Sequence, residues 1–289
     1  MHSFELLTPK NIPELVESLK KATENTKILA GGTDLVISLR EGKIKPDLII
    51  DISGVSEIDY IKEDNEYLLI GALTTFTEIA ENQSVVKYAK CLSEASDTVG
   101  SKQIRNRGTI GGNIGNSSPA GDTLPVLMAL EAKVIVIDSE GKIVELSIED
   151  VLMGQNKTTL NCNQAIIGVK IPKQMGNWIS TFVKLGSRMA VTIAKLSIAL
   201  NVNYNVEANV VEKVRLGLGA VGKTAYRATV IEELLQNKKV TKELADQFAE
   251  ELSIEIERAI PGRASLPYKK EAVRGVAYEA FDNLFLKHK

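Results

Sequence analysis

The chain has 289 residues and a formal net charge of −2 at pH 7. This length predicts two hydrophobic cores rather than one, and the near-neutral charge predicts neither a nucleic-acid partner nor an anionic membrane partner. Because no apolar run reaches membrane-spanning length and residues 1–10 show no signal-peptide pattern, we expect a cytoplasmic protein.

The first part of the sequence alternates predicted helices with short buried strands. Helical spacing of apolar residues predicts a helix over residues 11–22, which has Pro13 in its first turn, and another over residues 35–40. A helix near Glu78 is expected to be capped by Thr74, and a longer helix to cover residues 84–99. Strands are expected over residues 27–30, 48–52 and 67–72.

The middle of the chain contains a glycine turn at residues 108–113 and a polar loop at residues 116–122. A helix is expected to begin at Asp122 or Thr123, with Pro125 in its first turn. Turn residues between two apolar segments then predict a β-hairpin. Its strands are expected over residues 133–138 and 142–146, and a further strand over residues 166–171.

The polar stretch at residues 173–177 predicts a domain boundary. Strands are expected near residues 180–184, 194–202 and 210–221, and helices dominate from residue 229 onward. This order predicts an α+β fold. We expect a two-lobed first domain, residues 1–172, with lobes at about 1–58 and 59–172, and a second domain, residues 178–289, in which a three-stranded antiparallel sheet carries a helical cluster.

Cysteine and histidine usage restricts the chemistry. Cys91 and Cys162 form no C-x-x-C pair, so they are expected to be idle or buried thiols rather than cluster ligands. His2 and His288 lie at the ends of the chain, where residues are commonly frayed. A zinc site and a Ser-His-Asp triad are therefore excluded, and a bound cofactor is expected to supply any chemistry.

Two glycine loops are the candidate ligand sites. Residues 30–34 read A-G-G-T-D and residues 109–113 read T-I-G-G-N. Paired glycines can turn backbone N–H groups toward an anion, and two such loops fit a cofactor whose pyrophosphate is gripped from both sides. The alternative interpretation of the first loop is a tight turn with Thr33 or Asp34 as N-cap. Arg105 and Arg107 precede the second loop and either offset negative charge or form a solvated surface.

Two further segments need an interpretation. The loop S-S-P-A-G-D at residues 117–122 offers short polar side chains to a polyol or a heterocycle, with an N-cap role for Asp122 as the alternative. Residues 217–222 match G-x-G-x-x-G, but no βαβ unit surrounds them. We expect those glycines to permit close packing along a strand.

The loop at residues 30–34, followed by Q-I-R-N-R-G-T-I-G-G-N at residues 103–113, resembles the paired FAD signatures of the medium subunit of molybdenum hydroxylases, the family of xanthine, nicotinate and carbon monoxide dehydrogenases. The resemblance spans nearly the whole chain. It implies an FAD-binding domain of the vanillyl-oxidase-like type and noncovalent FAD. The FAD-binding residues implied by the resemblance and the loops are Ile28, Leu29, Ala30, Gly31, Gly32, Thr33, Asp34, Leu35, Val99, Thr109, Ile110, Gly111, Gly112, Asn113, Ser117, Ser118, Asp122, Ile166 and Lys184.

The resemblance also implies partners. A molybdopterin-binding large subunit oxidises the substrate, a small 2Fe-2S subunit relays electrons, and this chain passes them through FAD to an acceptor such as NAD. The complex is expected to be a dimer of heterotrimers. The alternatives are a stand-alone flavin oxidoreductase of the same fold and a binding protein that has lost flavin.

One departure from the family pattern lies at residues 187–193, where relatives carry acidic or aromatic residues beside the flavin and this chain has Val191 and Thr192. The small Thr192 leaves room for a nicotinamide, and equally for dioxygen or a protein acceptor such as ferredoxin. The identity of the acceptor therefore stays open at the level of the sequence.

Overall fold

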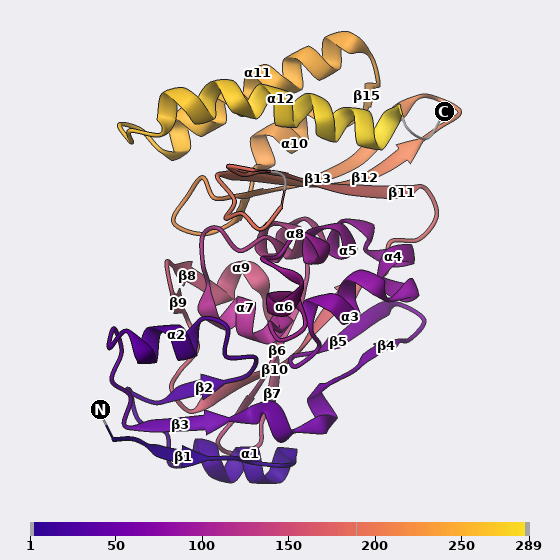
Figure 1. Ribbon diagram of the computed structural model, residues 1–289. Coiled ribbons are helices and arrows are strands. Elements are labelled where there is room, and N and C mark those ends of the chain that lie inside the picture. The colour runs from indigo at the N-terminus through magenta and orange to yellow at the C-terminus, as the bar shows by residue number, and fades with distance from the viewer. Residues whose placement is uncertain (1–2, 189, 287–289) are drawn as a thin grey trace.

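The computed structural model describes residues 3–188 and 190–286. Its β-strands form three larger sheets that follow one another along the chain, with helices between and above them (Figure 1). A two-stranded ribbon completes the described strands. Within the described residues, no helix is both long enough and apolar enough to cross a bilayer.

The first sheet is parallel and has the strand order β1-β3-β2. The helix expected over residues 11–22 spans only Ile12 to Leu19, and the Asn11 side chain caps its first turn by accepting from the Glu14 N–H. The elements of this lobe are β1 (Glu5–Leu7), α1 (Ile12–Leu19), β2 (Lys27–Leu29), α2 (Leu35–Arg40), β3 (Leu48–Asp51), η1 (Ile52–Gly54) and η2 (Ser56–Ile58).

The central sheet is antiparallel throughout and has the order β4-β5-β10-β6-β7. Its strands are β4 (Ile61–Glu63), β5 (Tyr67–Gly71), β6 (Lys133–Asp138), β7 (Ile143–Ser147) and β10 (Gln164–Pro172). The accompanying elements are α3 (Phe76–Glu81), α4 (Gln83–Tyr88), α5 (Lys90–Asp97), α6 (Lys102–Arg105), α7 (Ile110–Asn116), α8 (Thr123–Ala129), α9 (Ile148–Val151), β8 (Leu152–Gly154) and β9 (Lys157–Thr158).

Two helix predictions in this region are wrong in detail. The expected helix over residues 84–99 is broken at Ala89, whose φ of −149° and ψ of 51° lie outside the helical region, so α4 and α5 are separate. The cap of α3 is Thr75, which forms a capping box with Glu78. The hydroxyl of Thr74, just after β5, instead donates to the carbonyl of Tyr60, which directly precedes β4.

The C-terminal sheet has five strands, not three. Its long strands are β11 (Trp178–Leu185), β12 (Leu196–Asn205) and β13 (Val210–Gly219). The short strands β14 (Tyr226–Arg227) and β15 (Lys238–Lys239) both pair with β13, and two-residue pairings leave too weak a pattern to be predicted. The mixed α+β class is confirmed. The helices of this part are α10 (Thr229–Leu235), α11 (Lys242–Ala259) and α12 (Leu266–Phe285).

The C-terminal sheet is covered on both faces. Helices α11 and α12 lie above it and α5 and α8 lie below it (Figure 1). The contact with α8 below is tight: a Cβ added at Gly217 would lie 1.9 Å from the Pro125 carbonyl oxygen, and one at Gly219 would lie 3.0 Å from the Cγ of Pro125. The G-x-G-x-x-G match is therefore a packing feature of β13, as the sequence predicts.

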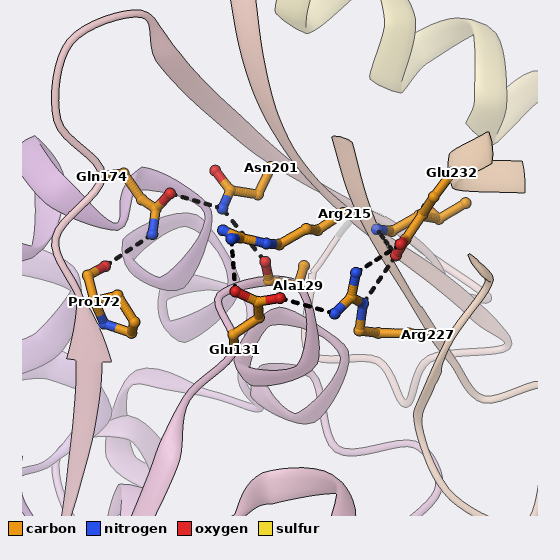
Figure 2. A network of polar contacts seen from close by, with 9 residues as sticks. Ala129, Glu131, Pro172, Gln174, Asn201, Arg215, Arg227 and Glu232 are labelled. Carbon is orange, nitrogen blue, oxygen red and sulfur yellow. Dashed lines mark hydrogen bonds and ion pairs between the residues drawn. The ribbon is translucent and has the colours of Figure 1, made fainter. Parts of the chain in front are cut away.

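A polar network also joins α8 to the C-terminal sheet (Figure 2). Glu131, which follows α8, pairs with Arg215 of β13 at 2.6 Å and with Arg227 of β14 at 3.0 Å. Arg227 makes two further bonds to the buried Glu232, which also accepts from the Leu216 N–H at 2.8 Å. A forked guanidinium between two carboxylates fixes the orientation of both.

Replacing Glu131 with glutamine is expected to lower the free energy of unfolding by about 1 kcal/mol, the range for a partly exposed member of a charge network. Urea unfolding followed by circular dichroism measures the loss. Glu140→Gln, in the exposed hairpin turn between β6 and β7, is the matched control and should change stability little. Equal losses in the two variants would show that the network does not stabilise the junction.

Candidate functional site

The two glycine loops lie against each other although about eighty residues separate them. A Cβ added at Gly31 would lie 1.8 Å from the carbonyl oxygen of Arg107, and one at Gly112 would lie 4.0 Å from the Cβ of Ala30. No side chain fits at the first position without moving one of the loops. The fold therefore brings the two sequence motifs into one site.

The first loop presents unpaired backbone donors. Within the described part of the chain, the N–H groups of residues 31–35 have no hydrogen-bond acceptor. Gly32 has a φ of +75°, a conformation that favours glycine. Asp34 occupies the N-cap position of α2, but its side chain caps no amide and accepts instead from the Thr33 hydroxyl at 3.2 Å. A run of free amides is suited to an anionic or polar ligand.

The second loop has a different role from the one that its sequence suggests. The N–H groups of Ile110 and Gly111 donate to the carbonyls of Thr74 and Ala72, at 3.1 and 3.0 Å. Those of Gly112 and Asn113 donate to the hydroxyl and the carbonyl of Thr109, at 3.1 and 2.9 Å. The expectation that the paired glycines expose their amides is therefore wrong, because these residues begin helix α7 with Thr109 as N-cap. Within this loop only the Thr109 N–H has no acceptor among the described residues.

Close packing explains the glycines of the second loop. A Cβ at Gly111 would lie 2.6 Å from the Cβ of Ala72 and 2.8 Å from its carbonyl oxygen. The Ala72 N–H in turn donates to Ile167, the neighbour of Ile166 on β10. The second loop therefore packs between the first loop and the end of the central sheet. The side-chain NH₂ of Asn113 has no protein acceptor among the described residues.

The loop at residues 117–122 contributes unequally. Ser117 has a left-handed φ of 46° and its hydroxyl donates to the Gly154 carbonyl at 3.0 Å, so it fastens α7 to β8 rather than facing a ligand. Ser118 accepts from the Ala120 N–H at 3.4 Å and shapes the turn. Asp122 precedes α8 without capping it, so the predicted N-cap alternative does not hold for its side chain.

Asp122 forms a buried ion pair with Lys184 at the end of β11. The ammonium lies 2.5 Å from one carboxylate oxygen of Asp122 and also donates to the Thr98 carbonyl, next to Val99, at 3.1 Å. The other oxygen of Asp122 is buried without a hydrogen-bond partner. Burial raises the pKa of Asp122 to about 6, and Lys184 opposes that rise. Asp122, Lys184 and Val99 thus come from three distant segments to one place.

The loop at residues 187–193 follows β11 and therefore lies close to Lys184 in the chain. The Thr192 hydroxyl accepts from the Ser187 N–H at 3.0 Å, and Gly186 is a glycine because a Cβ there would lie 2.1 Å from the Thr192 side chain. The small size of Thr192 therefore has a packing reason within the loop. Met189 lies outside the described residues.

The two cysteines are both free. Cys91 is buried within α5 and Cys162 is exposed, which confirms the expectation of isolated thiols. Burial raises the pKa of Cys91 to about 12, so this thiol stays protonated. Among the described residues, no three histidine, cysteine or acidic side chains are placed to hold a metal ion.

Comparisons with known proteins agree along nearly the whole chain. A family described as "FAD binding domain in molybdopterin dehydrogenase" matches residues 2–174, and one described as "CO dehydrogenase flavoprotein C-terminal domain" matches residues 181–284. The nicotinate dehydrogenase FAD-subunit of Eubacterium barkeri is 32% identical over 285 residues, which cover 97% of this chain and 96% of that protein. The glyceraldehyde dehydrogenase medium chain of Sulfolobus acidocaldarius is 32% identical over 96% of this chain and 97% of its own length.

Solved structures show the same likeness. A chain of carbon monoxide dehydrogenase from Hydrogenophaga pseudoflava superimposes with a TM-score of 0.89 at 26% identity, covering 98% of this chain and 97% of that chain. Matches of this extent cover both the glycine loops and the C-terminal sheet. The chain belongs to the family of FAD-binding medium subunits of molybdopterin hydroxylases, the flavin subunits of dehydrogenase complexes of the carbon monoxide and xanthine dehydrogenase type.

Proposed function

We propose that this chain binds one FAD noncovalently and passes electrons from a partner subunit to an acceptor. The observation that carries the proposal is the run of free N–H groups at residues 31–35, held against the second glycine loop. These amides suit the pyrophosphate of a dinucleotide. The unpartnered oxygen of Asp122 is a free acceptor for a cofactor hydroxyl. The residues therefore fit FAD.

The remaining FAD-binding assignments follow the same geometry. The proposed pyrophosphate and ribityl contacts are residues 28–35 and 109–113, the latter through side chains and the Thr109 N–H rather than through the amides of the paired glycines. Val99, Ile166 and Lys184 are proposed to line the flavin. Asp122 is proposed to lie near the ribityl or adenosine portion, with Ser118 at the border of the site. When bound, FAD supplies a carrier that exchanges electrons either singly or in pairs.

We also propose the assembly and the domain division. Residues 1–172 form a two-lobed FAD domain of the vanillyl-oxidase-like type, and residues 178–289 form a second domain. The partners are a molybdopterin-binding large subunit and a small 2Fe-2S subunit, arranged as a cytoplasmic dimer of heterotrimers. We propose that the electron acceptor is either NAD or a protein carrier and that it approaches at the loop of residues 187–193. We propose neither nucleic acid nor a membrane as a partner.

The test is co-purification with the neighbouring subunits. We expect the isolated chain to be yellow, to release FAD on acid precipitation, and to hydroxylate neither nicotinate, glyceraldehyde nor xanthine. Its two cysteines are too few for an iron–sulfur cluster, and no group of described residues is placed to hold a metal ion. In the complex, one such substrate should bleach the flavin absorbance. Hydroxylation by the isolated chain would favour a stand-alone flavoenzyme, and a complex that releases no FAD on acid precipitation would exclude FAD binding.

A further inference from the structure

A cationic surface lies beside the proposed flavin end of the site. Lys195, at the close of the loop after β11, lies with its ammonium 5.0 Å from the ring centroid of Tyr268 on the first turn of α12. The next residue, Lys269, donates to the Ala220 carbonyl at 2.6 Å, and the Ala220 N–H donates to Pro119 at 2.8 Å. Pro119 belongs to the loop that ends at Asp122, so this surface adjoins the proposed flavin site.

The positive charge of this surface is not neutralised. None of Lys195, Arg263 and Lys269 forms an ion pair with a described residue. Burial lowers the pKa of Lys269 and the charge of Arg263 lowers it further. Arg263 lies in the turn before α12, where its carbonyl accepts from the Leu266 N–H at 2.9 Å. The guanidinium of Arg188 donates to the backbone carbonyls of Ala190 and Val191. Because these carbonyls are uncharged, the positive charge of Arg188 is not neutralised either.

The same surface exposes apolar side chains. Ile193 is 78% exposed, Tyr268 50% and Val191 49%. Exposed apolar groups beside cations that lack an ion-pair partner are typical of a protein-docking surface, and the exposed Glu271 on the next turn of α12 pairs with Arg274 at 3.6 Å. We name the six residues Val191, Ile193, Lys195, Arg263, Tyr268 and Lys269 the cationic face. In Figure 1 the loop after β11 and the turn between α11 and α12 lie at the same end of the C-terminal sheet.

We infer that the cationic face docks an acidic protein that accepts electrons one at a time. Charge complementarity between opposite patches steers such encounters and accelerates them, and the apolar centre supplies contact area once the proteins meet. The docked carrier takes one electron per encounter, so two carriers dock in turn for each electron pair, and no atom passes between the proteins. The inference rests on the proposed function for the presence of a flavin nearby, but docking itself does not require the flavin.

Binding tests the inference without enzyme turnover. Zinc-substituted rubredoxin, an acidic and redox-inert carrier, is titrated into the full chain in a calorimeter. At about 20 mM salt we expect binding that weakens about tenfold or more by about 200 mM salt, as screening of several charge pairs requires. Basic cytochrome c should not bind. The double variant Lys195→Glu/Arg263→Glu should lose at least about tenfold in affinity for rubredoxin, or about 1.4 kcal/mol.

The matched control is Lys239→Glu. Lys239 is an exposed lysine on β15, at the opposite end of α11. This variant should bind rubredoxin like the unaltered chain. Absence of rubredoxin binding, or equal binding by the double variant and the unaltered chain, would overturn the inference. NAD binding that the double variant abolishes would also overturn it, by assigning these cations to a dinucleotide. The FAD absorbance of the same samples reports on the proposed function separately.

Discussion

Replacing Gly31 with alanine is expected to release FAD from the chain. The added Cβ would lie 1.8 Å from the Arg107 carbonyl oxygen, a backbone atom of the second glycine loop that no rotamer change can move. The two loops must separate, which displaces the free amides of residues 31–35. Overpacking of this kind costs about 1–3 kcal/mol, so the affinity for FAD should fall about 10- to 100-fold.

The measurement is equilibrium titration of the FAD-depleted chain with FAD, followed by flavin fluorescence. Gly275→Ala is the matched control, since Gly275 lies on α12 and a Cβ there has no atom within 4 Å. It should leave FAD affinity unchanged. If Gly31→Ala folds and binds FAD as tightly as Gly275→Ala does, the first loop is not the pyrophosphate site.

The different fates of the two glycine loops show how far sequence can be used to predict this site. Both motifs contain paired glycines, and the sequence assigns them the same role. A run of free amides remains in the first loop, whereas in the second loop Thr74 and Ala72 accept from Ile110 and Gly111, Thr109 accepts from Gly112 and Asn113, and only the Thr109 N–H has no acceptor among the described residues. Thr74 and Ala72 lie just after β5, more than thirty residues away, and nothing in the T-I-G-G-N motif reveals them. A sequence motif predicts the positions at which glycine is required. Whether glycine is required there for ligand binding or for close packing depends on contacts with residues distant in the sequence.

The secondary structure likewise divides into elements that local sequence predicts and elements that it does not. Strongly patterned strands such as β6, β10 and β12 lie close to their predicted ranges, because alternating or continuous apolar residues determine them locally. The break at Ala89 and the short strands β14 and β15 depend on neighbours in space. Only the family resemblance predicts that Lys184 and Asp122 belong to the same FAD site. No feature of the sequence predicts that they form an ion pair.

Replacing Lys184 with methionine is expected to destabilise the chain, freed of FAD, by about 3–5 kcal/mol at pH 8, the range for removing one partner of a buried ion pair. Asp122 would be left as a buried carboxylate with neither oxygen paired, since its second oxygen already has no partner. Urea unfolding at pH 8 measures the loss. Lys20→Met, at the exposed pair with Glu17, is the control and should cost less than about 1 kcal/mol.

The pH dependence of this loss identifies its cause. Burial raises the pKa of Asp122 from 3.8 to about 6 in the folded chain, so the folded state binds the proton more tightly than the unfolded state does. The stability contributed by this group is therefore fully present below about pH 4 and is lost as the pH rises through about 6. Removing Lys184 takes away the influence that lowers this pKa, so the variant should lose most stability at pH 8 and much less at pH 5, where Asp122 is protonated.

The double variant Asp122→Asn/Lys184→Met should lose this pH dependence, because it retains no titrating group at the site. Equal destabilisation by Lys184→Met at pH 5 and pH 8 would mean that lost packing, not an unpaired carboxylate, accounts for the effect.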